Sequence, residues 1–365
     1  MDALKPEPAP SLELKAIQRP EPGWISEVLG TTIRAMEVRA LESGKGFQST
    51  TWQLLLSCDP ADSAPRSLVL KSETGNPEAN AFTHLNRSFQ REIGVYNHLV
   101  PRLKNHQPVI YGCSDSQPCW LLMEDLSHLR SGDQLRGMTQ AETLASLRSM
   151  AVLHAEFWLD PQLAQHAWLP AHSFWFQRPQ ADLIEPFFEN YDVRLGVTAT
   201  KILRAVLEQG DAIDTALSER PWTLVHGDLR ADNLLFGGLD TAPTATIIDW
   251  SWACRSLASM DIAFLIGGSE PIRQRHGHLD ELLSIWHGTL LNHGVHDYPL
   301  IDARRDLQLA ALRCLTTAIA MYKFLLDSGV SVRTALFVDQ AIQRHSAFVL
   351  ELKAWEALPE RVALS

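Results

Sequence analysis

Short apolar runs separated by polar turns dominate the first third of the chain. Each run is rich in Leu, Val or Trp and is bounded by Gly, Pro, Asp or Ser, a pattern typical of β-strands. The runs lie at residues 50–57, 67–71 and 119–123. Between the second and the third, apolar residues recur at helical spacing over 89–100, and Pro101 follows. This spacing predicts an amphipathic helix that Pro101 ends.

Helical periodicity replaces the strand pattern from about residue 139. Thr139 and Glu142 form a capping-box sequence, in which each side chain accepts a hydrogen bond from the backbone N–H of the other residue. Further helical periods fill 180–218, 277–292, 303–326 and 332–356. The change of pattern near residue 125 predicts a domain boundary.

A short β-rich segment at 222–250 interrupts the helical half. The β-forming stretches are 223–225, 234–236 and 246–248, and polar residues fall in the connections between them. His226, Asp228 and Asn233 therefore share one loop, while Asp249 follows the last of these strands. A hairpin would bring Asp249 back beside that loop.

Two carboxylates and an amide at strand ends suit the transfer of a phosphoryl group to a hydroxyl. Asp228 would orient the hydroxyl and accept its proton, while Asn233 and Asp249 would hold Mg²⁺ on the phosphates of ATP. The alternative is a polar turn without catalytic function, because Asp and Asn favour turns in any protein.

The spacing H-G-D-x-x-x-x-N, followed by an apolar strand that ends in Asp, resembles the family of aminoglycoside, choline and ecdysteroid kinases. The motif begins at His226-Gly227-Asp228 and continues at Ile248-Asp249-Trp250. The resemblance implies a bilobal protein-kinase-like fold of the α+β class. A small antiparallel sheet with one αC-type helix forms its N-lobe, and the larger C-lobe is mainly helical. The expected divisions are a flexible arm at 1–22, a nucleotide-binding lobe at 23–125 and a catalytic, acceptor-binding lobe at 126–365.

The residues around the motif favour the small-molecule branch of this fold. Protein kinases carry H-R-D and D-F-G at the corresponding places, whereas this chain has Gly227 and Trp250-Ser251. Arg230 follows the expected base and would steady the charge of the γ-phosphate, or it is a surface arginine. Asp261 corresponds to a buried structural acid of the family, or it is a simple acid in the first turn of a helix.

The first half contains the parts that a kinase needs to bind a nucleotide, in the required order. The implied nucleotide-binding residues are Gly44, Gly46, Ser49, Lys71, Glu92, Glu124 and Leu126. The first three form a turn over the phosphates, and Lys71, braced by Glu92, contacts the α- and β-phosphates. Backbone groups of the last two contact adenine. The alternatives are an ordinary loop and a solvated Lys71 and Glu92.

Composition narrows the possible partners. A net charge of −11 at pH 7 disfavours nucleic acid, whose binding relies on basic patches. The five cysteines are odd in number and contain no C-x-x-C pair, which favours a reducing compartment. Arg313 and Lys323 interrupt the longest apolar stretch, which predicts a core helix instead of a membrane span. We expect a cytoplasmic protein without a membrane partner.

Together these features predict an ATP- and Mg²⁺-dependent kinase that phosphorylates a hydroxyl of a small molecule. The alternative is a catalytically silent, kinase-like module that binds nucleotide. The acceptor stays open among aminoglycosides, amino alcohols, sterols and other metabolites, and the oligomeric state is not predicted. Aromatic residues are dense over 158–190 and either line an acceptor pocket or belong to the core. His154 is predicted to be a core histidine.

Overall fold

A computed structural model of the chain describes residues 20–41, 49–59, 64–103, 107–171, 179–326 and 330–360. It divides into two compact units. One comprises Met1–His98 and Pro108–His128, and the other comprises Leu99–Gln107 and Leu129–Ser365. The first unit is built on an antiparallel sheet and the second is mainly helical, which confirms the predicted α+β class.

The first unit contains a five-stranded sheet in the order β1-β2-β3-β5-β4, with all neighbours antiparallel. Its strands are β1 (Thr32–Ala40), β2 (Thr50–Asp59), β3 (Ser67–Ser72), β4 (Ile110–Ser114) and β5 (Trp120–Glu124). Its helices are α1 (Pro22–Leu29), α2 (Pro77–Leu85) and α3 (Ser88–Gly94). Helix α3 continues through a π-helical turn (Val95–Leu99) and a short 3-10 turn (Val100–Arg102), and the chain passes into the second unit at Leu99. The predicted strands β2, β3 and β5 and the predicted helix over 89–100 are confirmed.

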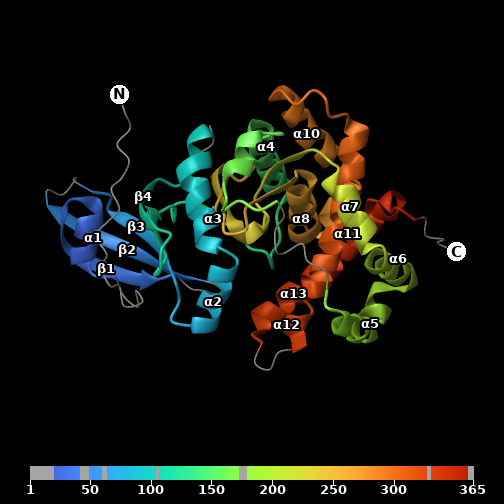
Figure 1. The fold of residues 1–365 in the computed structure, drawn as a ribbon, viewed down its shortest axis with the longest axis horizontal. Helices are drawn as coiled ribbons and strands as arrows, with labels where there is room; N and C mark the ends of the chain where they lie inside the picture. Colours follow the sequence, from blue (N-terminus) through green and yellow to red (C-terminus); the bar gives the residue numbers. More distant parts are fainter. Residues whose placement is uncertain are drawn as a thin grey trace. The chain divides into compact units, whose positions relative to one another are not determined.

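Strand alternation decides which side chains of the sheet enter the core. Leu68, Leu70 and Ser72 of β3 are buried on one face of the sheet. Ile25 of α1 belongs to the same core cluster as Leu68 and Leu70, and Figure 1 shows α1 beside the sheet. Because successive side chains of a strand point to opposite faces, Lys71 projects from the other face. The buried face therefore fixes the direction in which Lys71 points.

Several elements of this unit were not predicted. Strand β1 lies at the sheet edge and carries mostly exposed side chains, so it lacks the apolar run that marks a buried strand. Helix α1 begins at Pro22, inside the segment predicted to be a flexible arm. The rest of that arm, residues 1–19, lies outside the described residues. Helix α2 is capped by Asn76, whose side chain accepts hydrogen bonds from two backbone N–H groups.

The second unit is an assembly of helices around a small β-region. Its main helices are α4 (Gln140–Glu156), α5 (Ala181–Leu195), α6 (Val197–Glu208), α7 (Gly210–Ser218), α8 (Ser259–Ser269), α10 (Leu279–Asn292), α11 (Leu300–Ala320) and α13 (Val332–Glu351). Shorter elements are α9 (Ile272–Arg275), α12 (Lys323–Leu326) and 3-10 turns at Pro161–Gln165 and Ala354–Ala357. Figure 1 shows α8 and α11 inside this assembly. The predicted capping box is confirmed, because Glu142 N donates to Thr139 Oγ1 and Thr139 N donates to Glu142 Oε2.

The structure divides one predicted helical segment and buries the longest apolar one. The helical period over 180–218 is divided into three helices, with breaks at Gly196 and Gln209. The segment Leu300–Leu326 is long and apolar enough to cross a membrane, but 72% of its most apolar window is buried inside the protein. Burial of that extent is what a core helix requires, as predicted.

The β-region holds the motif residues. Strands β6 (Arg130–Ser131), β8 (Leu234–Leu239) and β9 (Ala242–Ile247) form one antiparallel sheet, and β7 (Trp222–Val225) pairs with β10 (Cys254–Leu257).

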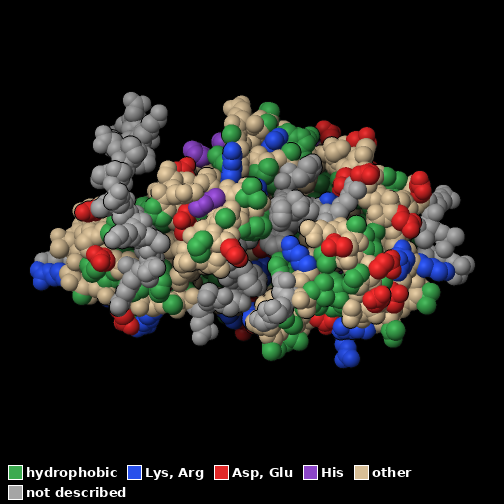
Figure 2. All heavy atoms as spheres, turned by 60° about the horizontal axis from the view of Figure 1, so that its bottom comes forward, with side chains coloured by type: hydrophobic (Ala, Val, Ile, Leu, Met, Phe, Trp, Pro, Cys, Tyr) green, Lys and Arg blue, Asp and Glu red, His purple; other side chains and the backbone are tan. Residues whose placement is uncertain are grey.

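On the face shown in Figure 2, acidic and basic side chains are interspersed. The excess of acids, a net charge of −11, therefore does not gather in one patch on that face.

Helix α8 crosses α13 closely at a glycine. A Cβ atom on Gly267 would lie 2.6 Å from His345 Nδ1 and 2.9 Å from Phe348 Cδ1, while a Cβ on Gly288 in α10 would meet nothing within 4 Å. His345 and Phe348 are themselves buried, so neither can move aside easily. The two helical glycines thus occupy opposite environments.

We expect Gly267→Ala and Gly288→Ala to change the free energy of unfolding in opposite directions. Gly267→Ala should lower it by about 1–3 kcal/mol through overpacking. Gly288→Ala should raise it by roughly 0.5–1 kcal/mol, because alanine costs less backbone entropy in a helix. Urea unfolding measures both. A stabilising Gly267→Ala would contradict the packing of α8 on α13.

Candidate active site

The motif residues lie on one tight loop after β7. This loop runs from His226 to Asn233 and includes a 3-10 turn at Ala231–Asn233. Gly227 has a φ of +82°, a left-handed conformation that glycine adopts without strain. The backbone therefore explains why glycine follows His226 in this chain.

Asp261 fixes the start of the loop. Its carboxylate accepts hydrogen bonds from the backbone N–H of His226 at 2.7 Å and of Gly227 at 3.0 Å. The side chain lies in the first turn of α8 and is fully buried. His154, also fully buried, contacts the same carboxylate at 3.3 Å through Nε2 and receives the indole N–H of Trp286 at Nδ1. Asp261 is thus a buried anchor, and His154 is a core histidine as predicted.

His226 joins the loop to the strand that precedes Asp249. Its Nδ1 accepts from the backbone N–H of Asp228 at 3.2 Å, and its Nε2 lies 2.9 Å from Ile248 O. These partners assign the neutral tautomer with the proton on Nε2. Because Ile248 N donates in turn to Asn233 O, Asp228, Asn233 and Asp249 are held in one group.

Asp228 lies at the centre of this group. Its Oδ2 accepts from Asn233 Nδ2 at 3.1 Å and from Arg230 Nε at 3.2 Å. Burial raises the pKa of Asp228 above its ordinary value, and the positive charge of Arg230 only partly offsets that rise. A raised pKa makes the carboxylate a better proton acceptor.

Arg230 lies between two acids and over an aromatic ring. Its Nη1 donates to Asp232 Oδ2 at 2.6 Å, and its guanidinium lies 5.3 Å from the ring centre of Phe337 in α13. Burial alone would lower the pKa of Arg230, but Asp228 and Asp232 raise it. Arg230 is therefore a charged, mostly buried side chain in contact with Asp228, and not a surface arginine.

Asp249 adopts a left-handed conformation, with a φ of +65°, which is uncommon outside glycine. Its Oδ1 accepts from the hydroxyl of Ser251 at 2.7 Å. Among the described residues no hydrogen bond reaches Asn233 Oδ1, because the amide N–H of Asn233 is directed at Asp228. Carboxylate and amide oxygens are the ligands that Mg²⁺ prefers, so the donor set of Asn233 and Asp249 fits this ion.

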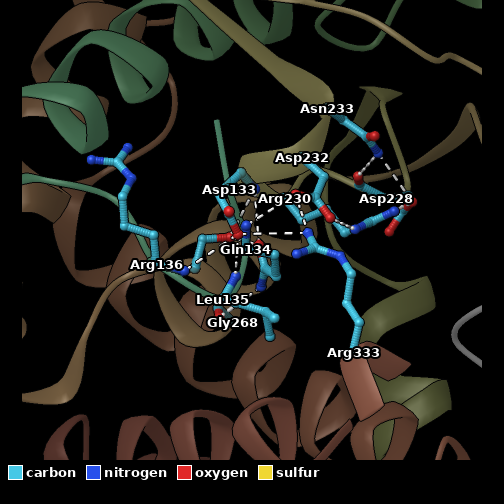
Figure 3. Close-up of polar contacts among 12 residues, drawn as sticks. Asp133, Gln134, Leu135, Arg136, Asp228, Arg230, Asp232, Asn233, Gly268 and Arg333 are labelled. Atoms are coloured by element: carbon cyan, nitrogen blue, oxygen red, sulfur yellow. Dashed lines mark hydrogen bonds and ion pairs between the residues drawn. The ribbon is translucent and has the colours of Figure 1, made fainter. Parts of the chain in front are cut away.

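A second loop from β6 supports the motif loop. Ala231 N donates to Gln134 Oε1 and to Ser269 Oγ, both at 3.0 Å, and Gln134 N donates to Asp232 Oδ1 at 3.0 Å. A Cβ on Gly132 would lie 2.0 Å from Ala231 O. Figure 3 shows this support, with Asp133, Gln134 and Leu135 grouped beside Arg230 and Asp232. Gln134 was not singled out from the sequence, because it is separated from Asp232 by 98 residues.

The first unit contains a second part of the predicted site. Lys71 Nζ donates to Glu92 Oε2 at 2.6 Å, and both side chains are largely buried, so the solvated alternative is wrong. Gly44 and Gly46 lie outside the described residues, and Ser49 is half-buried just before β2. Glu124 ends β5, and Leu126 is buried. Nucleotide contacts of these residues stay predictions.

Of the aromatic residues over 158–190 that the structure describes, two are buried and two, Trp158 and Trp168, are half-buried. Phe187 and Phe188 are fully buried, and Phe187 stacks on Tyr191 with 5.0 Å between ring centres. Residues 172–178 lie outside the described residues. The core interpretation therefore holds for Phe187 and Phe188.

Another group with possible metal ligands lies in the first unit. Glu73, His84 and Cys119 place ligand atoms within 4.8 Å of one another. His84 Nε2 contacts Glu73 Oε1 at 2.7 Å, and Cys119 N donates to the same oxygen. Burial raises the pKa of the Cys119 thiol to about 12. Direct hydrogen bonds thus account for the group without a metal.

Comparison with known proteins gives a consistent result. The model of a family described as the phosphotransferase enzyme family matches residues 45–290. Among the curated proteins compared, none matches. A structure from Ralstonia eutropha, assigned as an aminoglycoside phosphotransferase, is similar with a TM-score of 0.54 and 14% identity, and the match covers 91% of this chain and 96% of that chain.

Two further solved structures are similar. Choline kinase from Cryptosporidium parvum has a TM-score of 0.54 and 10% identity, with 88% of this chain and 93% of that chain covered. The GDP complex of aminoglycoside 2′-phosphotransferase-IIIa has a TM-score of 0.53 and 13% identity, with 86% and 93% covered. At these identities the similarity shows a common fold.

We expect Asp261→Asn to impair both stability and turnover. An amide cannot accept from both backbone N–H groups with the strength of a carboxylate, so the free energy of unfolding should fall by roughly 2–3 kcal/mol. The motif loop should lose its fixed position, and kcat should fall with it. Urea unfolding and steady-state kinetics measure the two effects. Unchanged stability would show that Asp261 does not anchor the loop.

Proposed function

The chain belongs to the phosphotransferase enzyme family, and from this we propose that it is a small-molecule kinase that transfers the γ-phosphoryl group of ATP to a hydroxyl. The observation that carries the proposal is the grouping of Asp228, Asn233 and Asp249. A base and two oxygen ligands held close together are what this transfer requires.

Asp228 acts as the base in this proposal. The acceptor hydroxyl donates a hydrogen bond to the carboxylate and attacks the γ-phosphorus in line with the leaving oxygen. A bond forms between the acceptor oxygen and phosphorus, the bond from phosphorus to the β-phosphate oxygen breaks, and the hydroxyl proton passes to Asp228. ADP and the phosphorylated acceptor are the products.

Asn233 and Asp249 would hold Mg²⁺ through their side-chain oxygens. The ion, when bound, neutralises charge on the phosphates. The chain itself contributes the fixed orientation of these ligands: Asn233 is set by its hydrogen bonds to Asp228, and Asp249 by Ser251. Asn233 thereby links the base and the metal ligands in one bonded group.

Lys71 supports the proposal from within the first unit. The side chain is held extended by Glu92 at 2.6 Å, and in kinases such a lysine contacts the α- and β-phosphates. ATP is the donor we propose. GTP is the second donor to test, since a similar phosphotransferase structure contains GDP.

Asp228→Asn tests the base directly. We expect kcat to fall by at least about 100-fold, because a positioned general base contributes on the order of 10²–10⁴ in rate, whereas the affinity for magnesium–ATP should change little. The assay is ADP formation with a panel of small alcohols that includes aminoglycosides, amino alcohols, sugars, sterols and hydroxy acids. Calorimetry measures nucleotide binding in parallel.

Asp240→Asn is the matched control, because Asp240 lies in the turn between β8 and β9 and its side chain is 95% exposed. It should retain wild-type turnover. Turnover retained by Asp228→Asn would overturn the proposed base. Magnesium–ATP binding without turnover of any alcohol would favour the silent nucleotide-binding module.

A further inference from the structure

Arg333 is a cation beside the motif loop whose side chain makes only long contacts to its neighbours in the described residues. It lies in the first turn of α13, and its side chain is 36% exposed. Its Nη2 is 3.6 Å from Asp133 Oδ1 and 3.7 Å from Asp232 Oδ1, and it makes no hydrogen bond within the described part of the chain. Figure 3 shows Arg333 extending from the helix toward the loop of Asp228 to Asn233. A guanidinium has several N–H donors, and Arg333 uses only Nη2, in two long ion-pair contacts, within the described residues.

Asp232 has closer hydrogen-bond partners than Arg333. It is only 4% exposed and already accepts the short hydrogen bond from Arg230 Nη1 at 2.6 Å and the backbone N–H of Gln134 at 3.0 Å. Asp232 is therefore held by Arg230 and by the backbone of Gln134. The longer contact to Arg333 adds little to this arrangement.

Asp133 does not hold Arg333 firmly either. Its Oδ1 accepts from the backbone N–H of Leu135 at 2.8 Å and of Arg136 at 3.3 Å. The side chain is 41% exposed, and a long ion pair between partly exposed groups contributes little stability. Arg333 can therefore exchange its contact to Asp133 for a stronger anionic partner.

The position of Arg333 relative to the motif loop is nevertheless fixed by buried contacts further along α13. Arg344 Nη1 donates to Gln134 O at 2.8 Å and to Gly268 O at 3.0 Å. Phe337, one turn after Arg333, contacts the guanidinium of Arg230. The face of α13 that bears Arg333 and Phe337 is thus directed at the loop that carries Asp228.

We propose that Arg333 binds an anionic group of the acceptor, a carboxylate or a phosphate, while Asp228 receives the acceptor hydroxyl. This inference rests on the proposed kinase activity and makes Arg333 a specificity-determining residue. A guanidinium matches a carboxylate or phosphate in a two-point, charge-assisted hydrogen bond. The acceptor class is therefore a hydroxylated acid.

A cationic acceptor fits this side of the loop less well. An amine would have to bind Asp133 or Asp232, but both carboxylates already accept shorter hydrogen bonds from the chain. It would also lie beside the positive charges of Arg230 and Arg333. An anion meets neither obstacle.

Matched compounds test the inference by equilibrium binding. The probes are ω-hydroxy carboxylates of three to six carbons, their amides, the amino alcohols of equal length, and hydroxyalkyl phosphates as the second anionic arm. Calorimetry with the protein saturated with magnesium–ADP measures each dissociation constant. We expect an acid, carboxylate or phosphate, to bind more tightly than its amide and its amine.

Arg333→Gln should weaken binding of that acid by roughly 10- to 100-fold, the range expected for one charge-assisted pair, and should leave its amide unchanged. Arg333→Lys keeps the charge but loses the two-point geometry. Its affinity for the acid should lie between those of wild type and Arg333→Gln. If the enzyme turns over the preferred acid as an acceptor, Arg333→Gln should raise the KM for that acid with little change in kcat. Arg304→Gln is the control, since Arg304 is also partly exposed and ion-paired at the surface.

The inference is overturned if no acid binds more tightly than its amide, or if Arg333→Gln binds the preferred acid as well as wild type does. Failure of the kinase proposal has a different signature, namely no ADP from any alcohol. Tighter binding of the acid that depends on Arg333 would support the acceptor class even in that case.

Discussion

The carboxylate of Asp261 is the constraint on which the candidate active site depends. It is buried at the start of α8 and accepts the first two backbone N–H groups of the motif loop. Without it, those N–H groups would be left buried and unpaired, which proteins avoid because each such group is costly. His226 then connects the loop to the residue before Asp249, through the hydrogen bond from its Nε2 to Ile248 O. The backbone position of Asp228 is thus set by hydrogen bonds within the loop and to Asp261.

Charge balance around Asp228 is the second constraint. Burial raises the pKa of this carboxyl, while Arg230 keeps the rise limited. Arg230 also donates to Asp232, so one arginine lies between two acids. This arrangement places a positive charge against a buried carboxylate. Arg333 Nη2 lies 3.7 Å from the other oxygen of Asp232, and its side chain makes no hydrogen bond within the described residues.

Local spacing in the sequence was sufficient to predict the group of His226, Asp228, Asn233 and Asp249, because one loop and one hairpin bring these residues together. The pairing of Lys71 with Glu92 was also predictable, since strand alternation and helical spacing each fix one partner. Gln134 and Arg333 were not predictable, because only the fold brings segments so distant in sequence to the motif loop. The edge strand β1 escaped prediction because its side chains are mostly exposed. A division of the long helical period at 180–218 depends on single breaks that periodicity does not reveal.

The central claim is that this chain moves the γ-phosphoryl group of ATP to a small alcohol. The most direct measurement is to incubate the protein with γ-³²P-labelled ATP, Mg²⁺ and a pool of small-molecule metabolites, and to separate the products by size and charge. The account predicts label in a small organic phosphate ester, in amounts that grow with time and vanish when the metabolites are omitted. Label that stays in ATP, or appears only in inorganic phosphate or in protein, would contradict the account.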